Sequence, residues 1–187
     1  MLKEEKVTVL IVPGYGDSGP GHWQSLWQQK QPAYRRVEQQ DWEFPQRDQW
    51  VATLEQTVAK IAGPIIFVAH SLGCTLVAQW AATYSSNVGK VQGALLVAPP
   101  DVEQPGMSLV IEGFSPVPLQ LLPFRSILVA SSNDRFISLE QSTVLAHAWG
   151  SHFVNIGPAG HINTDSGFGE WPLGETFLTE LFEEYLL

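Results

Sequence analysis

Apolar runs and helical patterns alternate along the chain. Six short stretches rich in aliphatic residues predict strands. They are Val7–Val12, Ala33–Glu38, Ile65–Ala69, Val91–Val97, Ser126–Ala130 and His152–Ile156. Several of these stretches are unbroken apolar runs, the pattern of strands that helices cover on both faces. We therefore predict a mainly parallel sheet buried between helices.

Apolar residues recur at helical intervals between these runs. The spacing is clear in Arg47–Ala62, in the residues after Ser71, and near the C-terminus from Phe177 onward. Alternating strands and helices imply right-handed crossovers and a doubly wound α/β fold, a three-layer sandwich. No internal repeat or linker divides the pattern, so we expect a single domain over residues 1–187.

The segment Pro99–Phe124 interrupts this alternation. It contains six prolines and has poor prospects of forming a helix. Long loops in compact domains often cover functional sites. We expect this loop, residues 99–124, at the position of a cap, where it would wall a shallow site suited to small acyl groups.

Composition and charge narrow the class of protein. The 187 residues are 44% hydrophobic and 16% charged, which is a globular composition. The formal charge of −9 disfavours a nucleic-acid partner. The single cysteine, Cys74, permits no intrachain disulfide and favours a reducing compartment. Because no apolar stretch is long enough for a membrane span, we expect a cytoplasmic protein that acts on a small molecule.

The most informative stretch is Ala69-His70-Ser71-Leu72-Gly73, which joins a buried strand to a helix. This pattern predicts a nucleophile elbow, a sharp turn that exposes the serine Oγ above the sheet edge in a strained backbone conformation. The turn needs very small residues two positions before and after the serine. Gly73 meets that need, and Ala69 stands where glycine is usual. Ser71 is therefore the candidate nucleophile.

Two further residues complete the order Ser, Asp, His that this arrangement requires. Asp134 follows the fifth predicted strand and His161 the sixth, so both belong at the carboxyl edge of the sheet. His161 would take the proton of Ser71 during attack, and Asp134 would hold the correct tautomer of the histidine. Asp101, after the fourth strand, is the alternative acid.

The glycine-rich stretch Gly14–Gly21 (GYGDSGPG) follows the first predicted strand and matches three patterns. They are the G-x-G-x-x-G of dinucleotide-binding loops, the GDSG around the nucleophile of chymotrypsin-like proteases, and the turn that supplies part of an oxyanion hole in α/β hydrolases. No histidine precedes Ser18, although the protease order requires one. Glycine and proline delay the next helix to about His22, which disfavours the dinucleotide pattern because its helix opens within the motif.

We therefore interpret Gly14–Gly21 as an oxyanion loop. An oxyanion hole needs two N–H donors aimed at the charge that develops during reaction. The backbone N–H of Leu72, at the start of the helix after the elbow, is one candidate. Tyr15 is the preferred second donor, and Gly16 is the alternative.

These residues make the chain similar to the small serine hydrolases related to retinoblastoma-binding protein 9, a branch of the α/β-hydrolase fold. The stretches that carry the resemblance are Val12–Trp27, Asp41–Trp50, Val68–Trp80, Phe114–Ser138 and Gly157–Gly174. The resemblance implies a compact six-stranded sheet, a triad of Ser71, Asp134 and His161, and hydrolysis of small esters or amides without a metal ion or cofactor. The retinoblastoma protein is not expected as a partner, because Leu72–Leu76 (LGCTL) lacks the final glutamate of L-x-C-x-E.

The pocket and the competing functions complete the expectations. We expect Gly16, His22, Trp23 and Trp171 to contact substrate, and we expect the His70 side chain to point away from Ser71. The preferred function is a carboxylesterase-like serine hydrolase that forms an acyl-enzyme. The alternative is a non-catalytic binding protein that retains the α/β-hydrolase fold.

Overall fold

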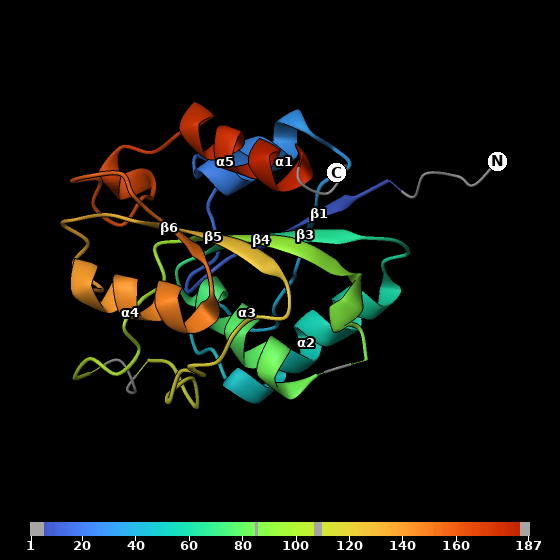
Figure 1. Cartoon of the computed structure of the whole chain (residues 1–187), viewed down its shortest axis with the longest axis horizontal. Coiled ribbons are helices and arrows are strands. Elements are labelled where there is room, and N and C mark those ends of the chain that lie inside the picture. Colours follow the sequence, from blue (N-terminus) through green and yellow to red (C-terminus); the bar gives the residue numbers. More distant parts are fainter. Residues whose placement is uncertain (1–5, 85, 107–109, 184–187) are drawn as a thin grey trace.

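The computed structural model describes residues 6–84, 86–106 and 110–183 and contains one parallel sheet (Figure 1). The sheet has six strands in the order β2-β1-β3-β4-β5-β6, and every neighbouring pair is parallel. The strands are β1 (Thr8–Val12), β2 (Arg35–Arg36), β3 (Ile65–His70), β4 (Val91–Val97), β5 (Arg125–Ala130) and β6 (His152–Asn155). The order changes direction between β1 and β3, which is where open α/β sheets bind their ligands.

Helices cover both faces of the sheet. They are α1 (Trp23–Lys30), α2 (Arg47–Lys60), α3 (Leu72–Thr83), α4 (Leu139–Trp149) and α5 (Pro172–Glu183), with short 3-10 turns at Val88–Lys90 and Thr164–Ser166. Figure 1 shows α1 and α5 on one face, and α2, α3 and α4 on the other. The three layers confirm the predicted doubly wound α/β fold. Within the residues described, no helix is both long and apolar enough to cross a membrane.

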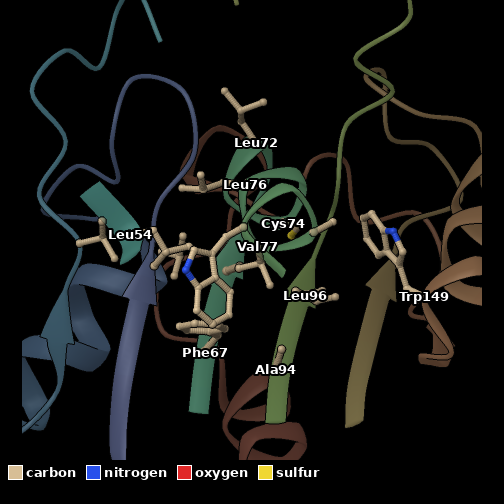
Figure 2. Close-up of a cluster of buried hydrophobic side chains, with 14 of the residues drawn as sticks. Leu54, Phe67, Leu72, Cys74, Leu76, Val77, Ala94, Leu96 and Trp149 are labelled. Carbon is tan, nitrogen blue, oxygen red and sulfur yellow. The ribbon is translucent and has the colours of Figure 1, made fainter. Parts of the chain in front are cut away.

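Strand β3 explains the unbroken apolar pattern. Ile65 and Phe67 belong to the core cluster on the α2–α3 side, whereas Ile66 and Val68 belong to the cluster under α1 and α5, and all four are buried. Figure 2 shows Phe67 among the side chains of α3. Burying each such side chain contributes roughly 2 kcal/mol. Because both faces of the strand are covered, Ile65–Ala69 are all apolar, and the polar His70 comes only at the carboxyl end of the strand.

Three segments differ from the sequence-based expectation or extend it. The second strand shortens to Arg35–Arg36, because it lies at the sheet edge and pairs with β1 alone. Helix α4 was not predicted; Ser138 caps its start and Gly150 ends it in the left-handed conformation. In the loop 99–124, residues 107–109 lie outside the described residues. The parts of the loop that are described hold no helix or strand, only an isolated bridge from Glu112 to Gln46.

Candidate active site

The turn between β3 and α3 has the geometry of a nucleophile elbow. Ser71 adopts φ 53° and ψ −128°, a region that costs a non-glycine residue of order 1–3 kcal/mol. A Cβ at Gly73 would overlap the carbonyl oxygen of Val12. Only glycine fits there without displacing backbone, which explains the requirement for a tiny residue at that position. Ala69 is fully buried, so the single methyl group is accommodated.

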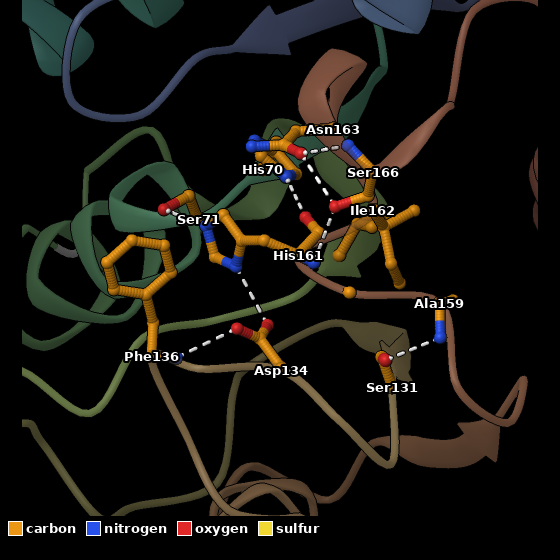
Figure 3. A network of polar contacts seen from close by, with 12 residues as sticks. His70, Ser71, Ser131, Asp134, Phe136, Ala159, His161, Ile162, Asn163 and Ser166 are labelled. Atoms are coloured by element: carbon orange, nitrogen blue, oxygen red, sulfur yellow. Dashed lines mark hydrogen bonds and ion pairs between the residues drawn. The ribbon is translucent and has the colours of Figure 1, made fainter.

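Ser71, His161 and Asp134 form a continuous hydrogen-bonded chain (Figure 3). His161 Nε2 lies 2.8 Å from Ser71 Oγ, and His161 Nδ1 lies 2.7 Å from Asp134 Oδ2. The Asp134 carboxylate is fully buried, and its other oxygen accepts the Phe136 N–H at 2.9 Å. Since a carboxylate only accepts, Nδ1 carries the proton and Nε2 is free to accept the serine hydroxyl. The alternative acid, Asp101, instead accepts the Glu103 N–H within its own turn.

Side chains hold together two loops at the site. One follows β5 and carries Asp134 (the acid loop), and the other follows β6 and carries His161 (the histidine loop). Asn133 Oδ1 accepts the Gly160 N–H at 2.7 Å, and Ser131 Oγ accepts the Ala159 N–H at 2.9 Å. The His161 N–H donates to Ser166 Oγ at 3.0 Å. These contacts orient the imidazole without using its ring nitrogens, so both nitrogens stay available for Ser71 and Asp134.

The glycine-rich loop packs against the elbow. A Cβ on Gly14 would lie 2.9 Å from the Leu72 nitrogen, so the two backbone segments are in close contact. The Gly16 N–H donates to the carbonyl of Trp42 at 2.9 Å, which removes Gly16 as a donor to substrate. Tyr15 and Leu72, the two preferred oxyanion donors, therefore lie on adjoining backbone. Helix α1 starts after the loop at Trp23, as expected for an oxyanion loop.

A cavity of about 390 Å³ opens over Ser71. The polar groups of its lining include those of His22, His70 and His161. Apolar side chains also line it, among them Leu72, Pro100, Val110, Ile111 and Phe136. Three of these apolar residues, Pro100, Val110 and Ile111, come from the proline-rich loop 99–124. That loop therefore forms part of the cavity wall, as a cap would.

Trp23 and Trp171 lie in the core and not in the wall of this cavity. Both are buried, and their rings are 5.1 Å apart. The Trp23 indole N–H donates to the Ile162 carbonyl at 2.9 Å. The two tryptophans thus support the histidine loop from behind. Gly16 also lies outside the cavity lining, while His22 and Tyr15 are part of it.

Comparisons with known proteins identify the family of this chain. The family model described as serine hydrolase matches residues 9–180. The chain belongs to this serine hydrolase family. No curated protein matches it.

Solved structures resemble this serine hydrolase over almost its whole length. A YdeN-like hydrolase from Pectobacterium atrosepticum has 30% identity and a TM-score of 0.83, covering 95% of this chain and 91% of that one. The ydeN gene product of B. subtilis has 21% identity and a TM-score of 0.78, with coverage of 95% and 100%. Est1E from Butyrivibrio proteoclasticus, solved with ferulic acid bound, has 12% identity, a TM-score of 0.70 and coverage of 98% and 91%. The last two likenesses show the fold alone.

The serine hydrolase has two further histidines at the site. His22 caps α1 by accepting the Gln24 N–H through Nδ1 at 3.2 Å, which leaves the proton on Nε2. This buried Nε2 has no hydrogen-bond partner within the described residues. Burial, with a smaller contribution from the Arg36 charge, lowers the pKa of His22 to about 4. The neutral imidazole therefore offers an N–H beside the cavity.

The His70 side chain, which we expect to point away from Ser71, contacts His161 and lines the same cavity as Ser71. Its Nε2–H donates to the His161 carbonyl at 2.9 Å, and the two rings lie 5.0 Å apart (Figure 3). Burial lowers the pKa of His70 well below its usual value, so the ring is neutral. Sequence reasoning missed His70 and Phe136 as cavity residues. His70 directly precedes Ser71 and Phe136 stands two positions after Asp134, and this closeness in sequence is the signal that could have found them.

Other candidate reactive groups lie away from this chemistry. Cys74 is buried, its thiol donates to the Val97 carbonyl at 3.4 Å, and burial raises its pKa. A thiol in this environment is inert. Within the described part of the chain, no group of three or more His, Cys, Asp or Glu side chains is placed to hold a metal ion.

Proposed function

We propose that this serine hydrolase cleaves small carboxylic esters through an acyl-enzyme on Ser71. The observation that carries the proposal is the hydrogen-bonded chain from Ser71 Oγ through His161 to the buried Asp134 carboxylate. A serine hydroxyl becomes a useful nucleophile when an adjacent base takes its proton. His161 is that base, and Asp134 holds its tautomer and stabilises the imidazolium.

The reaction proceeds in two halves. Ser71 Oγ bonds to the ester carbonyl carbon while its proton passes to His161 Nε2. The backbone N–H groups of Leu72 and Tyr15 stabilise the resulting oxyanion. The tetrahedral intermediate then expels the alcohol, which takes the proton from His161. In the second half His161 deprotonates a water, the water attacks the acyl carbon, and the carboxylic acid leaves as Ser71 regains its proton.

The cavity supports small substrates. Its volume of about 390 Å³ lies near the lower end of the range for small-molecule sites. Its apolar wall suits a short acyl chain. The resemblance to the hydrolases related to retinoblastoma-binding protein 9 supports the same substrate class. These features make the enzyme carboxylesterase-like.

Labelling with a fluorophosphonate probe tests the proposal. The probe reacts with an activated serine as the oxygen displaces fluoride from phosphorus. We expect the wild type to be labelled, the Ser71→Ala variant to remain unlabelled, and the Ser132→Ala control, which changes an exposed serine on the acid loop, to be labelled like the wild type. A folded wild type that takes up no label would contradict catalysis and favour a binding protein on a hydrolase scaffold.

A further inference from the structure

Arg135 places a positive charge at the edge of the cavity. Its exposed side chain is part of the cavity lining. The guanidinium carbon lies 4.6 Å from the centre of the Phe136 ring, a cation–π contact. The Phe136 ring centre in turn lies 4.5 Å from that of His161. Two successive ring contacts therefore hold the cation close to the histidine that exchanges protons with substrate.

The Arg135 charge has no ion-pair partner within residues 6–84, 86–106 and 110–183. The carboxylates near the cavity are already engaged. Asp17 is paired with the largely buried Arg36 at 2.7 Å, and Asp134 is bonded to His161. Among the described residues that line the cavity, Arg135 thus offers a cation without an ion-pair partner to a bound ligand.

The formal charge of −9 does not cancel this local effect. At physiological ionic strength charges separated by more than about 8 Å are largely screened. A ligand anion in contact with Arg135 interacts with that guanidinium far more strongly than with distant surface carboxylates. The planar guanidinium also binds a carboxylate through two parallel hydrogen bonds.

The position of Arg135 indicates which end of the substrate it meets. The leaving oxygen must come within hydrogen-bond reach of His161 Nε2 to receive its proton. Phe136 and Arg135 lie beside that ring, whereas the carbonyl oxygen is directed to the backbone of Leu72 and Tyr15. The alcohol part of the substrate is thus the part nearest the guanidinium.

We propose that the natural substrates are esters whose alcohol part carries a carboxylate, and that Arg135 binds this carboxylate. The inference rests on the ester hydrolysis proposed above and adds a substrate class to it. Neutral esters of the same shape are then poorer substrates, because they leave the guanidinium without an anionic partner.

A matched pair of esters tests the inference. The probes are the butyrate esters of 4-hydroxybenzoate and of 4-hydroxybenzamide, which differ in a carboxylate against a neutral amide. We expect the ratio of their kcat/KM values to favour the carboxylate in the wild type. The Arg135→Gln variant should lower this ratio about tenfold, mainly through KM, because a charge-assisted pair is lost at a partly exposed site. Added salt should lower the wild-type ratio in the same direction.

The control variant is Arg35→Gln, which removes the same charge from an exposed position on β2, outside the cavity lining. It should leave the ratio unchanged. If both esters are cleaved and Arg135→Gln keeps the wild-type ratio, the inference is overturned while the proposed hydrolysis stands. If the wild type cleaves neither ester, the proposed hydrolysis fails and the inference fails with it. Equal melting temperatures of the variants would show that folding does not explain the result.

Discussion

Ser18 and Ser71 stand in similar local sequences, Gly-Asp-Ser-Gly and His-Ser-Leu-Gly, each in the loop or turn after a strand of the same sheet. Ser71 has a strained backbone with φ 53°, and its Oγ faces His161 Nε2 at 2.8 Å. Ser18 is buried, and its Oγ donates to the side-chain oxygen of Gln24 at 2.5 Å. Gln24 in turn donates to the Val68 carbonyl at 3.0 Å, so it ties the Ser18 loop to β3.

The difference between these serines lies in the acceptor of the hydroxyl proton. An amide oxygen accepts a hydrogen bond, but it is far too weak a base to remove the proton. An imidazole nitrogen accepts the same bond and titrates near neutral pH. Ser18 therefore fastens a loop, whereas Ser71 can become a nucleophile. A glycine close to a serine in the sequence does not decide between these roles; the tertiary partner of the serine hydroxyl does.

The largest expected effect comes from the acid at the end of the Ser71 chain. Asp134→Asn should lower kcat by about 10⁴-fold, because the amide no longer selects the tautomer that accepts the serine proton. Asp101→Asn is the matched control and should keep near wild-type activity, since Asp101 only caps its own turn. Steady-state kinetics with a chromogenic ester measure both. If Asp101→Asn inactivates the enzyme and Asp134→Asn does not, the acid is wrongly assigned.

The second-largest expected effect is a difference in stability between a substitution at Gly73, in the elbow, and one at Gly19, in the loop that carries Ser18. Gly73→Ala should lower the free energy of unfolding by at least about 3 kcal/mol, because its Cβ would overlap backbone atoms of Val12 and Pro13. Gly19→Ala has open space around its Cβ and should change stability by less than about 0.5 kcal/mol. Urea unfolding measures the difference. Equal stabilities would show that the elbow tolerates a side chain.

The free energy of unfolding should depend on pH through His22, which caps helix α1, the helix that carries Gln24. The folded-state pKa of His22 is about 4 against an ordinary value of 6.5, so the unfolded chain binds the proton more readily. The contribution of His22 to stability is complete above pH 6.5 and falls by about 3 kcal/mol as the pH decreases to 4. His22→Asn keeps a capping oxygen and should flatten this dependence, measured as unfolding free energy between pH 4 and 7. The pKa of the buried His70 is lowered as well, so His70 adds a pH dependence of the same sign. Part of the pH dependence should therefore remain in the variant.

The smallest expected effect tests Ser18 itself. Ser18→Ala removes the donor to Gln24 and leaves a buried amide oxygen unpaired, which should cost about 1–2 kcal/mol of stability. Ester hydrolysis at 25 °C should stay close to wild type, because Ser18 does not contact the reacting groups. A large loss of kcat with an unchanged melting temperature would contradict the purely structural role of this serine.

The strands of the sheet were predictable because strands covered on both faces must be apolar throughout. Val91–Val97 is a strand with the predicted bounds, and the other central strands differ by one residue at an end. The prediction from the apolar pattern failed in segments that are not strands covered on both faces. The edge strand retains only Arg35–Arg36, and helix α4 was missed between two predicted strands. Its ends depend on capping by Ser138 and Gly150, which the apolar pattern does not show.

By itself the sequence determined the parallel sheet, the elbow at Ser71, and the positions of Asp134 and His161 after successive strands. These features depend on burial and on backbone sterics among neighbouring residues, which are local. Only the tertiary structure showed that His161 bonds to Asp134 and not to Asp101 and that the Gly16 N–H donates to the Trp42 carbonyl, and only it placed Trp23 and Trp171 in the core. The contacts that decide the acid join residues 27 and 90 positions apart in the chain. They exist because the strand order brings the carboxyl ends of β3, β5 and β6 to one edge of the sheet, and no local pattern encodes which side chains then meet.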